Sequence, residues 1–121
     1  MATVKNFEDL EIWKNSRALT KLVYEDFRNN KDFGFKDQIQ RCAVSIMNNI
    51  AEGFCRQSDS EKVNFFNIAK GSASELKNMY YIAEDLKYVS PETTLERRNS
   101  AQGIMNGIAS FMKYLKNYIT K

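Results

Sequence analysis

Basic and aromatic side chains alternate in the last quarter of the sequence, and this mixture could bind a nucleic acid. All 15 acidic residues occur at or before Glu96, so the charged side chains beyond it are all cations. Cations neutralise phosphates, and tyrosine rings can stack on bases. The candidate nucleic-acid-binding residues are Arg97, Arg98, Lys113, Tyr114, Lys116 and Tyr118. The alternative is a solvated basic face on which lysine stems cover apolar surface.

Catalytic and metal chemistry has less support. The sequence contains no histidine, which removes the commonest general base and the commonest zinc ligand. None of the five glycines belongs to a G-x-x-x-x-G-K-[ST] or G-x-G-x-x-G phosphate-binding motif. Glu52 and Glu75 are the first candidates for a metal-dependent site, but a hydrogen-bonded structural network explains them as well. We therefore predict no enzyme activity, no catalytic residue, no cofactor and no metal.

The two cysteines do not form a disulfide framework. Cys42 and Cys55 fall in one predicted helix, where a rise of about 1.5 Å per residue separates them by roughly 20 Å. We predict buried or partly buried free thiols. The N-terminus has no apolar segment like that of a secretory signal, and the longest uncharged run is shorter than the roughly 18 residues that suggest a membrane span. These features predict a cytoplasmic protein without membrane contact.

Four amphipathic helices must position these side chains. Apolar residues recur at spacings of three and four, with turn-forming residues between the periodic segments. Short connections place successive helices antiparallel, so we predict an all-α, up-down-up-down four-helix bundle that forms a single domain over residues 1–121. The predicted helices span about Phe7 to Asn29, Phe35 to Arg56, Ser58 to Lys87, and Pro91 nearly to the C-terminus.

Local signals mark the helix starts and one close contact. Ser58 and Glu61 fit a capping box, and Ser90 followed by Pro91 fits a second helix start. Gly103 and Gly107, one turn apart, predict the close approach of another helix. The core-facing stripe of the last helix is predicted to begin with Leu95.

The third helix carries more apolar surface than one bundle needs. Met79 to Ala83 is apolar on every side, whereas a bundle helix normally buries one face. We predict an interface between copies of the chain, with deep burial within a monomer as the alternative. The candidate interface residues are Phe66, Tyr80, Tyr81 and Met112.

Four segments together carry a resemblance to a known family. They are Asp9 to Trp13, Gln38 to Ile46, Asn49 to Gly53 with the run Asn-Ile-Ala-Glu-Gly, and Ala69 to Leu76. On these segments the chain resembles the four-helix-bundle proteins encoded in intervening sequences of bacterial 23S ribosomal RNA genes, sometimes labelled ribosomal proteins. Cys42 stands where these proteins usually have a small residue.

The resemblance implies a homopentamer of up-down bundles that associates with RNA or ribosomes and has no enzyme activity. A more distant similarity is to accessory bundle proteins of diversity-generating retroelements, in which a basic pentameric barrel engages nucleic acid. Our first hypothesis is therefore a non-catalytic, oligomeric, RNA-associated protein. The alternative is a scaffold that binds a partner protein, such as a reverse transcriptase, without touching nucleic acid.

Overall fold

The computed structural model describes the backbone of residues 4–119 and the side chains of residues 4–115. A short 3₁₀ turn, Phe7–Asp9, precedes four α-helices. The α-helices are α1 (Glu11–Asp26), α2 (Phe33–Cys55), α3 (Asp59–Asp85) and α4 (Pro91–Ile119). None of these helices is long and apolar enough to cross a membrane over the described residues.

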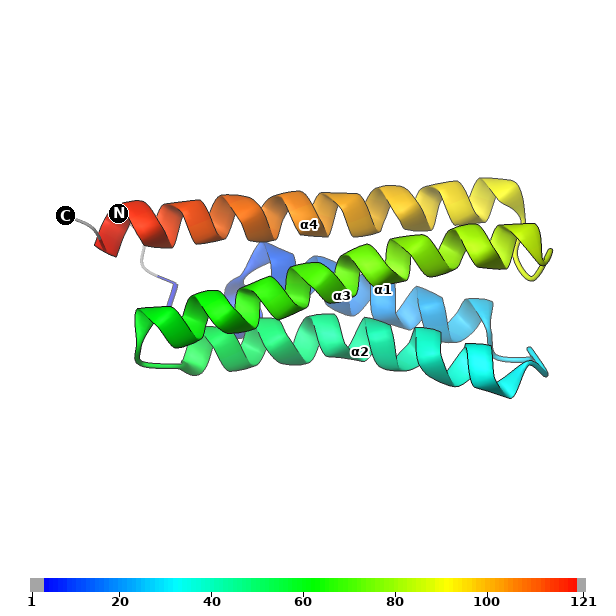
Figure 1. The fold of residues 1–121 in the computed structure, drawn as a ribbon, viewed down its shortest axis with the longest axis horizontal. Coiled ribbons are helices and arrows are strands. Elements are labelled where there is room, and N and C mark those ends of the chain that lie inside the picture. The colour runs from blue at the N-terminus through cyan, green and yellow to red at the C-terminus, as the bar shows by residue number, and fades with distance from the viewer. Residues whose placement is uncertain (1–3, 120–121) are drawn as a thin grey trace.

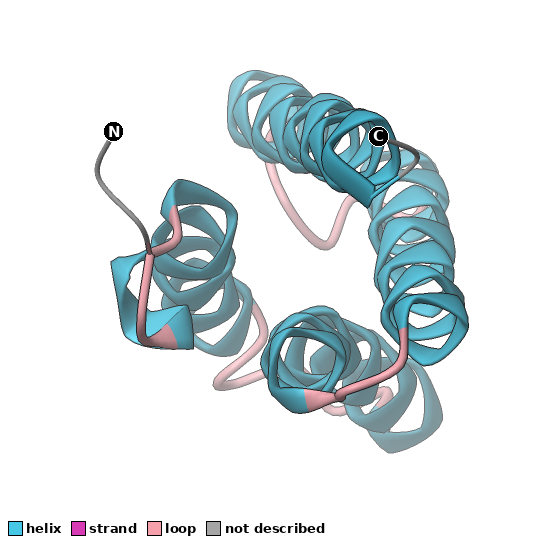
Figure 2. Cartoon of the chain, turned by 90° about the vertical axis from the view of Figure 1, so that its left-hand side faces the viewer, coloured by secondary structure: helices cyan, strands magenta, loops and turns pink. Residues whose placement is uncertain are grey.

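Successive helices run antiparallel around a common core. Each helix packs on the next one in sequence, and α1 completes the ring against α4. Figure 1 shows the four helices lying along one long axis, and Figure 2, which looks along that axis, shows them arranged around the centre. The predicted all-α, up-down-up-down four-helix bundle is confirmed.

Polar side chains begin three of the helices. The Asp32 carboxylate accepts a hydrogen bond from the Phe35 N–H at the start of α2 (3.2 Å). Ser58 Oγ accepts from the Glu61 N–H at the start of α3 (3.1 Å), and Ser90 Oγ accepts from the Thr93 N–H at the start of α4 (3.2 Å). These bonds satisfy backbone donors that have no partner within the helix, and the two predicted serine caps are confirmed.

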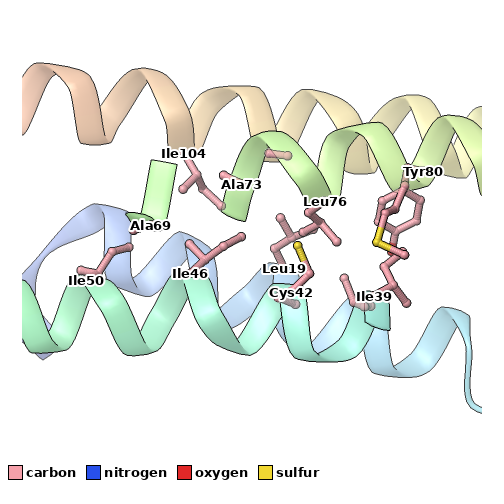
Figure 3. Close-up of a cluster of buried hydrophobic side chains, with 14 of the residues drawn as sticks. Leu19, Ile39, Cys42, Ile46, Ile50, Ala69, Ala73, Leu76, Tyr80 and Ile104 are labelled. Carbon is pink, nitrogen blue, oxygen red and sulfur yellow. The ribbon is translucent and has the colours of Figure 1, made fainter. Parts of the chain in front are cut away.

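The core is built mainly from aliphatic side chains of all four helices. Ile39, Ile46 and Ile50 of α2 face Leu76 and small alanines of α3, and Figure 3 shows them interleaved with Leu19 of α1 and Ile104 of α4. Alanines on α3 let the facing helices approach while the isoleucines fill the space between them. The bundle therefore buries one continuous apolar core.

Two expectations need correction, one about where the first helix starts and one about which residue of α4 faces the core. The first helix does not run unbroken from Phe7, because Leu10 has an extended backbone (ψ 129°) and α1 starts only at Glu11. This break brings the Phe7 ring against Trp13, with ring centroids 5.4 Å apart. Leu95 does not face the core and is 52% exposed. Thr94 occupies the buried position next to it.

The predicted close approach of a helix to the two glycines of α4 holds at one of them. A Cβ atom at Gly107 would lie 2.7 Å from Ile12 Cγ2 of α1, so the two helices touch there. A Cβ at Gly103 would meet nothing within 4 Å. Close packing also occurs at Gly53, where a Cβ would lie 3.0 Å from Phe65 Cβ and 3.3 Å from the Lys62 carbonyl oxygen. α2 and α3 therefore approach each other closely near their connection.

The two cysteines are free thiols, as predicted, but they differ in exposure. Cys42 is buried, whereas Cys55, the last residue of α2, is exposed. The expectation of two buried or partly buried thiols is therefore wrong for Cys55, because its side chain faces solvent at the end of α2.

Candidate nucleic-acid interface

Arg97 lies inside the bundle and not on its surface. Its Nε donates to Asp26 Oδ2 of α1 at 2.8 Å, and a second nitrogen donates to Asp26 Oδ1 at 3.1 Å. Tyr80 of α3 donates its hydroxyl to the same carboxylate at 2.8 Å. Only 10% of the Arg97 side chain is exposed. The expectation that Arg97 binds a phosphate is therefore corrected, because a buried carboxylate already holds its guanidinium.

Hydrogen bonding and charge at this buried cluster reinforce each other. The hydrogen bond to Asp26 is the main reason why the pKa of Arg97 is raised above its ordinary value. Burial raises the pKa of Tyr80, and the neighbouring Asp26 charge adds to the effect. Arg97 therefore stays charged and Tyr80 stays protonated as a hydrogen-bond donor.

Arg98, the next residue of α4, is also held within the molecule. Its guanidinium donates to Glu84 Oε1 of α3 at 2.7 Å and lies over the Tyr81 ring at 4.1 Å from the ring centroid. Thr94 donates its hydroxyl to the same Glu84 oxygen at 2.6 Å. The Arg98 side chain is 12% exposed. The expectation that Arg98 contacts a phosphate is therefore corrected, because Glu84 already holds its guanidinium. We call this group, together with the Arg97 cluster, the paired end; its members are Asp26, Tyr80, Tyr81, Glu84, Thr94, Arg97 and Arg98.

The predicted residues nearer the C-terminus have different surroundings. Lys113 is exposed, and Tyr114 is half exposed with its ring stacked on Phe111 at a centroid distance of 6.1 Å. Adjacent helical residues point about 100° apart, so Lys113 and Tyr114 do not share one line along α4. The side chains of Lys116 and Tyr118 lie outside the described residues. Of the predicted set, Lys113 is the described cation that faces solvent.

Two lysines that the sequence analysis missed lie on α3 beside α4. Lys77 Nζ donates to Gln102 Oε1 of α4 at 2.8 Å, and Gln102 Nε2 donates to Asn106 Oδ1 at 2.9 Å. Lys70 is one heptad before Lys77 and therefore lies on the same edge of α3. Lys113 is one heptad after Asn106 and continues the line along α4. We call this line the basic seam; it consists of Lys70, Lys77, Gln102, Asn106 and Lys113.

The lysines of the basic seam have no acidic counterpart among the described residues. α4 carries no acidic residue after Glu96, and no carboxylate of the described residues pairs with Lys70, Lys77 or Lys113. Glu75 of α3 lies on the other edge of the helix, within 3.4 Å of Gln38 Nε2 of α2. The heptad spacing of the two lysines was the sequence signal that could have identified this edge.

The residues predicted for the oligomer interface also divide into buried and exposed side chains. Phe66 and Tyr80 are fully buried in the core, so their expected place on the surface is corrected. Met112 is half buried against the core. Tyr81 is 50% exposed, and Leu95 lies one turn before Arg98, the residue that covers the Tyr81 ring. Tyr81 and Leu95 are thus two exposed apolar side chains, one on each of the helices that meet at the paired end.

A family model for the 23S rRNA-intervening sequence protein matches residues 8–110, which include the paired end and both lysines of α3. The chain belongs to this family. Lys113 and Tyr114 lie beyond the matched residues. A comparison with curated proteins gave no match.

A solved structure supports the fold of this family member. The crystal structure of a protein of unknown function from the S23 ribosomal protein family of Bacteroides thetaiotaomicron superposes with a TM-score of 0.79. The two chains are 24% identical, and the similarity covers 84% of this chain and 98% of that chain. At this identity the likeness shows a shared bundle fold.

The carboxylates considered for a metal site are held in side-chain networks in this member of the family. Glu52 lies 3.1 Å from the Arg56 guanidinium, and Glu75 accepts from Gln38. Burial, followed by the nearby Glu75 charge, raises the pKa of the Cys42 thiol to about 12. No group of three or more Cys, Asp or Glu among the described residues could hold a metal ion. In the described part of the chain, Glu52 and Glu75 thus belong to structural networks of ion pairs and hydrogen bonds.

Ion pairs in the same region form mainly between neighbouring turns. Arg41 pairs with Asp37 at 2.8 Å on its own helix, and Arg56 pairs with Glu52 and with Glu61 of α3. Neither arginine pairs with Glu75 or Glu84 in the described part of the chain. Between α2 and α3, Ser45 Oγ and Ser72 Oγ share a hydrogen bond of 2.9 Å, which ties the two helices together.

Proposed function

We propose that the protein is a non-catalytic, oligomeric bundle protein that associates with RNA through the basic seam, in the cytoplasm. The observation that carries this proposal is the line of three lysines without a carboxylate partner among the described residues: Lys113 is exposed, and Lys70 and Lys77 are half-buried. Unpaired cations on a rigid helix pair attract a polyanion, and binding releases its condensed counterions. Membership of a family named after an rRNA intervening sequence agrees with RNA as the polyanion.

The test is the salt dependence of RNA binding. We expect the double variant Lys70→Glu, Lys113→Glu to bind a structured RNA more weakly, with a log–log salt slope reduced by about two because each lost phosphate contact contributes about one. Fluorescence anisotropy of a labelled RNA hairpin at several salt concentrations measures both quantities. The matched control is Lys21→Glu, Lys31→Glu, which makes the same change in charge at exposed positions on α1 and the following loop.

Equal slopes for the two double variants would contradict the proposal, because binding would then follow net charge alone. If the wild-type protein bound no RNA even at low salt, the scaffold hypothesis with a protein partner would replace it.

The oligomeric part of the proposal rests on two exposed apolar side chains, Tyr81 of α3 and Leu95 of α4. Both side chains are about half exposed, although Tyr81 belongs to the paired end and Leu95 directly follows Thr94, another of its members. We expect an oligomer in light scattering at micromolar concentration and a smaller species for Leu95→Asp, since a buried charge without a partner opposes association. Ile68→Asp is the control, because Ile68 is 44% exposed and lies one heptad before Glu75, on the edge of α3 that faces α2. A monomeric wild-type protein would contradict this part.

A further inference from the structure

The types of side chain on the basic seam bear on whether it binds single-stranded or double-stranded RNA. Proteins that bind single strands place exposed aromatic rings between their cations, and successive bases stack on these rings. Duplex RNA instead offers phosphates and 2′-hydroxyl groups across a wide, shallow minor groove, and its bases stay stacked on one another. The side chains between the lysines therefore indicate which form the surface fits.

Aromatic rings are absent from the exposed part of the basic seam between its lysines. On α3, Phe66 and Tyr80 point into the core and are fully buried. The exposed tyrosines lie at the margins: Tyr81 belongs to the paired end and has Arg98 over its ring, and Tyr114 stacks on Phe111. Within the described residues, no exposed ring lies between Lys77 and Lys113 on which a splayed base could stack.

Small and amide side chains occupy the surface between the lysines. On α3, Asn67, Gly71 and Ser74 are exposed next to Lys70 and Lys77. On α4, Gln102 and Asn106 are joined by a hydrogen bond and face the same side. Amides and hydroxyls can both donate to and accept from a 2′-hydroxyl group. A Cβ at Gly71 would meet nothing within 4 Å, so no side chain stands above the helix there.

The spacing of the cations suits a rigid, extended phosphate array. Lys70 and Lys77 are one heptad apart on a continuous helix, so their Cα atoms are separated by about 10 Å along its axis. α3 and α4 are both long, straight helices that lie side by side, as Figure 1 shows. The cations of the seam are thus held at fixed spacings along two packed helices.

We infer that the RNA bound by the basic seam is double-stranded, with Lys70, Lys77 and Lys113 on phosphates and the polar side chains between them on 2′-hydroxyl groups. This inference rests on the proposed function, and it adds the form of the RNA and the groups that recognise it. The lysines provide affinity, whereas Ser74, Gln102 and Asn106 distinguish RNA from DNA.

The experiment compares three labelled probes with the full-length protein: an RNA duplex of about 16 base pairs, the DNA duplex of the same sequence, and a polyuridine strand of equal phosphate number. We expect the RNA duplex to bind about tenfold more tightly than polyuridine, because the described part of the seam has no exposed ring between its lysines on which a base could stack. The variant Ser74→Ala, Asn106→Ala should lose the preference for RNA over DNA duplex and keep the salt slope of the wild type.

Each outcome separates this inference from the function on which it rests. Polyuridine binding as tight as duplex binding, with loss of both in Lys70→Glu, Lys113→Glu, would overturn the duplex inference and leave RNA association standing. Equal affinity for RNA and DNA duplexes in the wild type would overturn the role of the 2′-hydroxyl contacts. Absence of binding to all three probes at low salt would overturn both proposals.

Discussion

The paired end and the basic seam both contain cationic side chains and use them in opposite ways. At the paired end, each arginine is held by a carboxylate from another helix: Arg97 by Asp26 and Arg98 by Glu84. On the basic seam, Lys70, Lys77 and Lys113 have amides, small residues and solvent around them. The first region uses its cations to join helices, and the second leaves them available for a partner. A cluster of cations in a sequence therefore does not by itself indicate a binding surface.

The largest effect is expected where a buried pair is broken. Arg97→Met leaves the Asp26 carboxylate, whose side chain is 10% exposed, without its cation, so we expect a loss of about 3–5 kcal/mol in the free energy of unfolding. Urea denaturation measures this loss. The control is Asp26→Asn, Arg97→Met, which removes both charges and keeps an acceptor for the Tyr80 hydroxyl, and it should recover part of the stability. A loss below about 1 kcal/mol in the single variant would show that the buried pair is not a structural link.

The adjacent arginine should matter less. Arg98→Met removes an ion pair whose Glu84 partner is 34% exposed, together with the contact to the Tyr81 ring, so we expect a loss of about 1 kcal/mol. RNA affinity and its salt slope should stay within error of the wild type, because the guanidinium is already occupied. A drop in the salt slope would place Arg98 with the basic seam and remove the contrast between the two regions.

A substitution beside Lys70 of the basic seam should increase the free energy of unfolding. Gly71→Ala replaces an exposed glycine inside α3, where nothing lies within 4 Å of the new methyl group, so we expect a gain of about 0.5–1 kcal/mol. Gly53→Ala is the matched comparison, since its methyl group would collide with Phe65 Cβ and should lower stability. Thermal denaturation followed by circular dichroism measures both. Loss of stability in Gly71→Ala would mean that another copy of the chain packs on this surface.

The smallest expected effect is a change in the stability of the folded protein at acidic pH. The hydrogen bond from Thr94, followed by that from Arg98, lowers the pKa of Glu84 from its ordinary value of 4.5. A carboxyl whose pKa is lower in the folded state stabilises that state above pH 4.5, and this contribution is lost as the pH falls through the folded-state pKa. The difference in stability between the wild type and Glu84→Gln should therefore shrink below that pH. A difference that does not change with pH would show that Glu84 contributes only by shape.

The sequence predicted the bundle well because apolar spacing and serine caps act locally. Ser58 and Ser90 start their helices as expected, and the apolar stripes of α2 and α3 form the core. The candidate site was predicted less well, because burial of a charged residue depends on a partner far away in the chain. Asp26 lies in α1, and nothing in the sequence near Arg97 indicates that the two meet. Leu95 was misplaced for the same reason, since Thr94 takes the inward position by bonding to Glu84 of α3.

The link between Asp26 and Arg97 joins residues 71 positions apart, and this separation bears on the order in which the bundle forms. Closing so long a loop costs more chain entropy than forming the hairpin of α2 and α3, whose contacts are closer in sequence. We therefore expect the hairpin to form early and α1 to dock onto α4 late. Arg97→Met should then speed unfolding and leave the refolding rate nearly unchanged, a division of rates that stopped-flow kinetics can measure. The buried pair would set how long the bundle stays closed and not how fast it assembles.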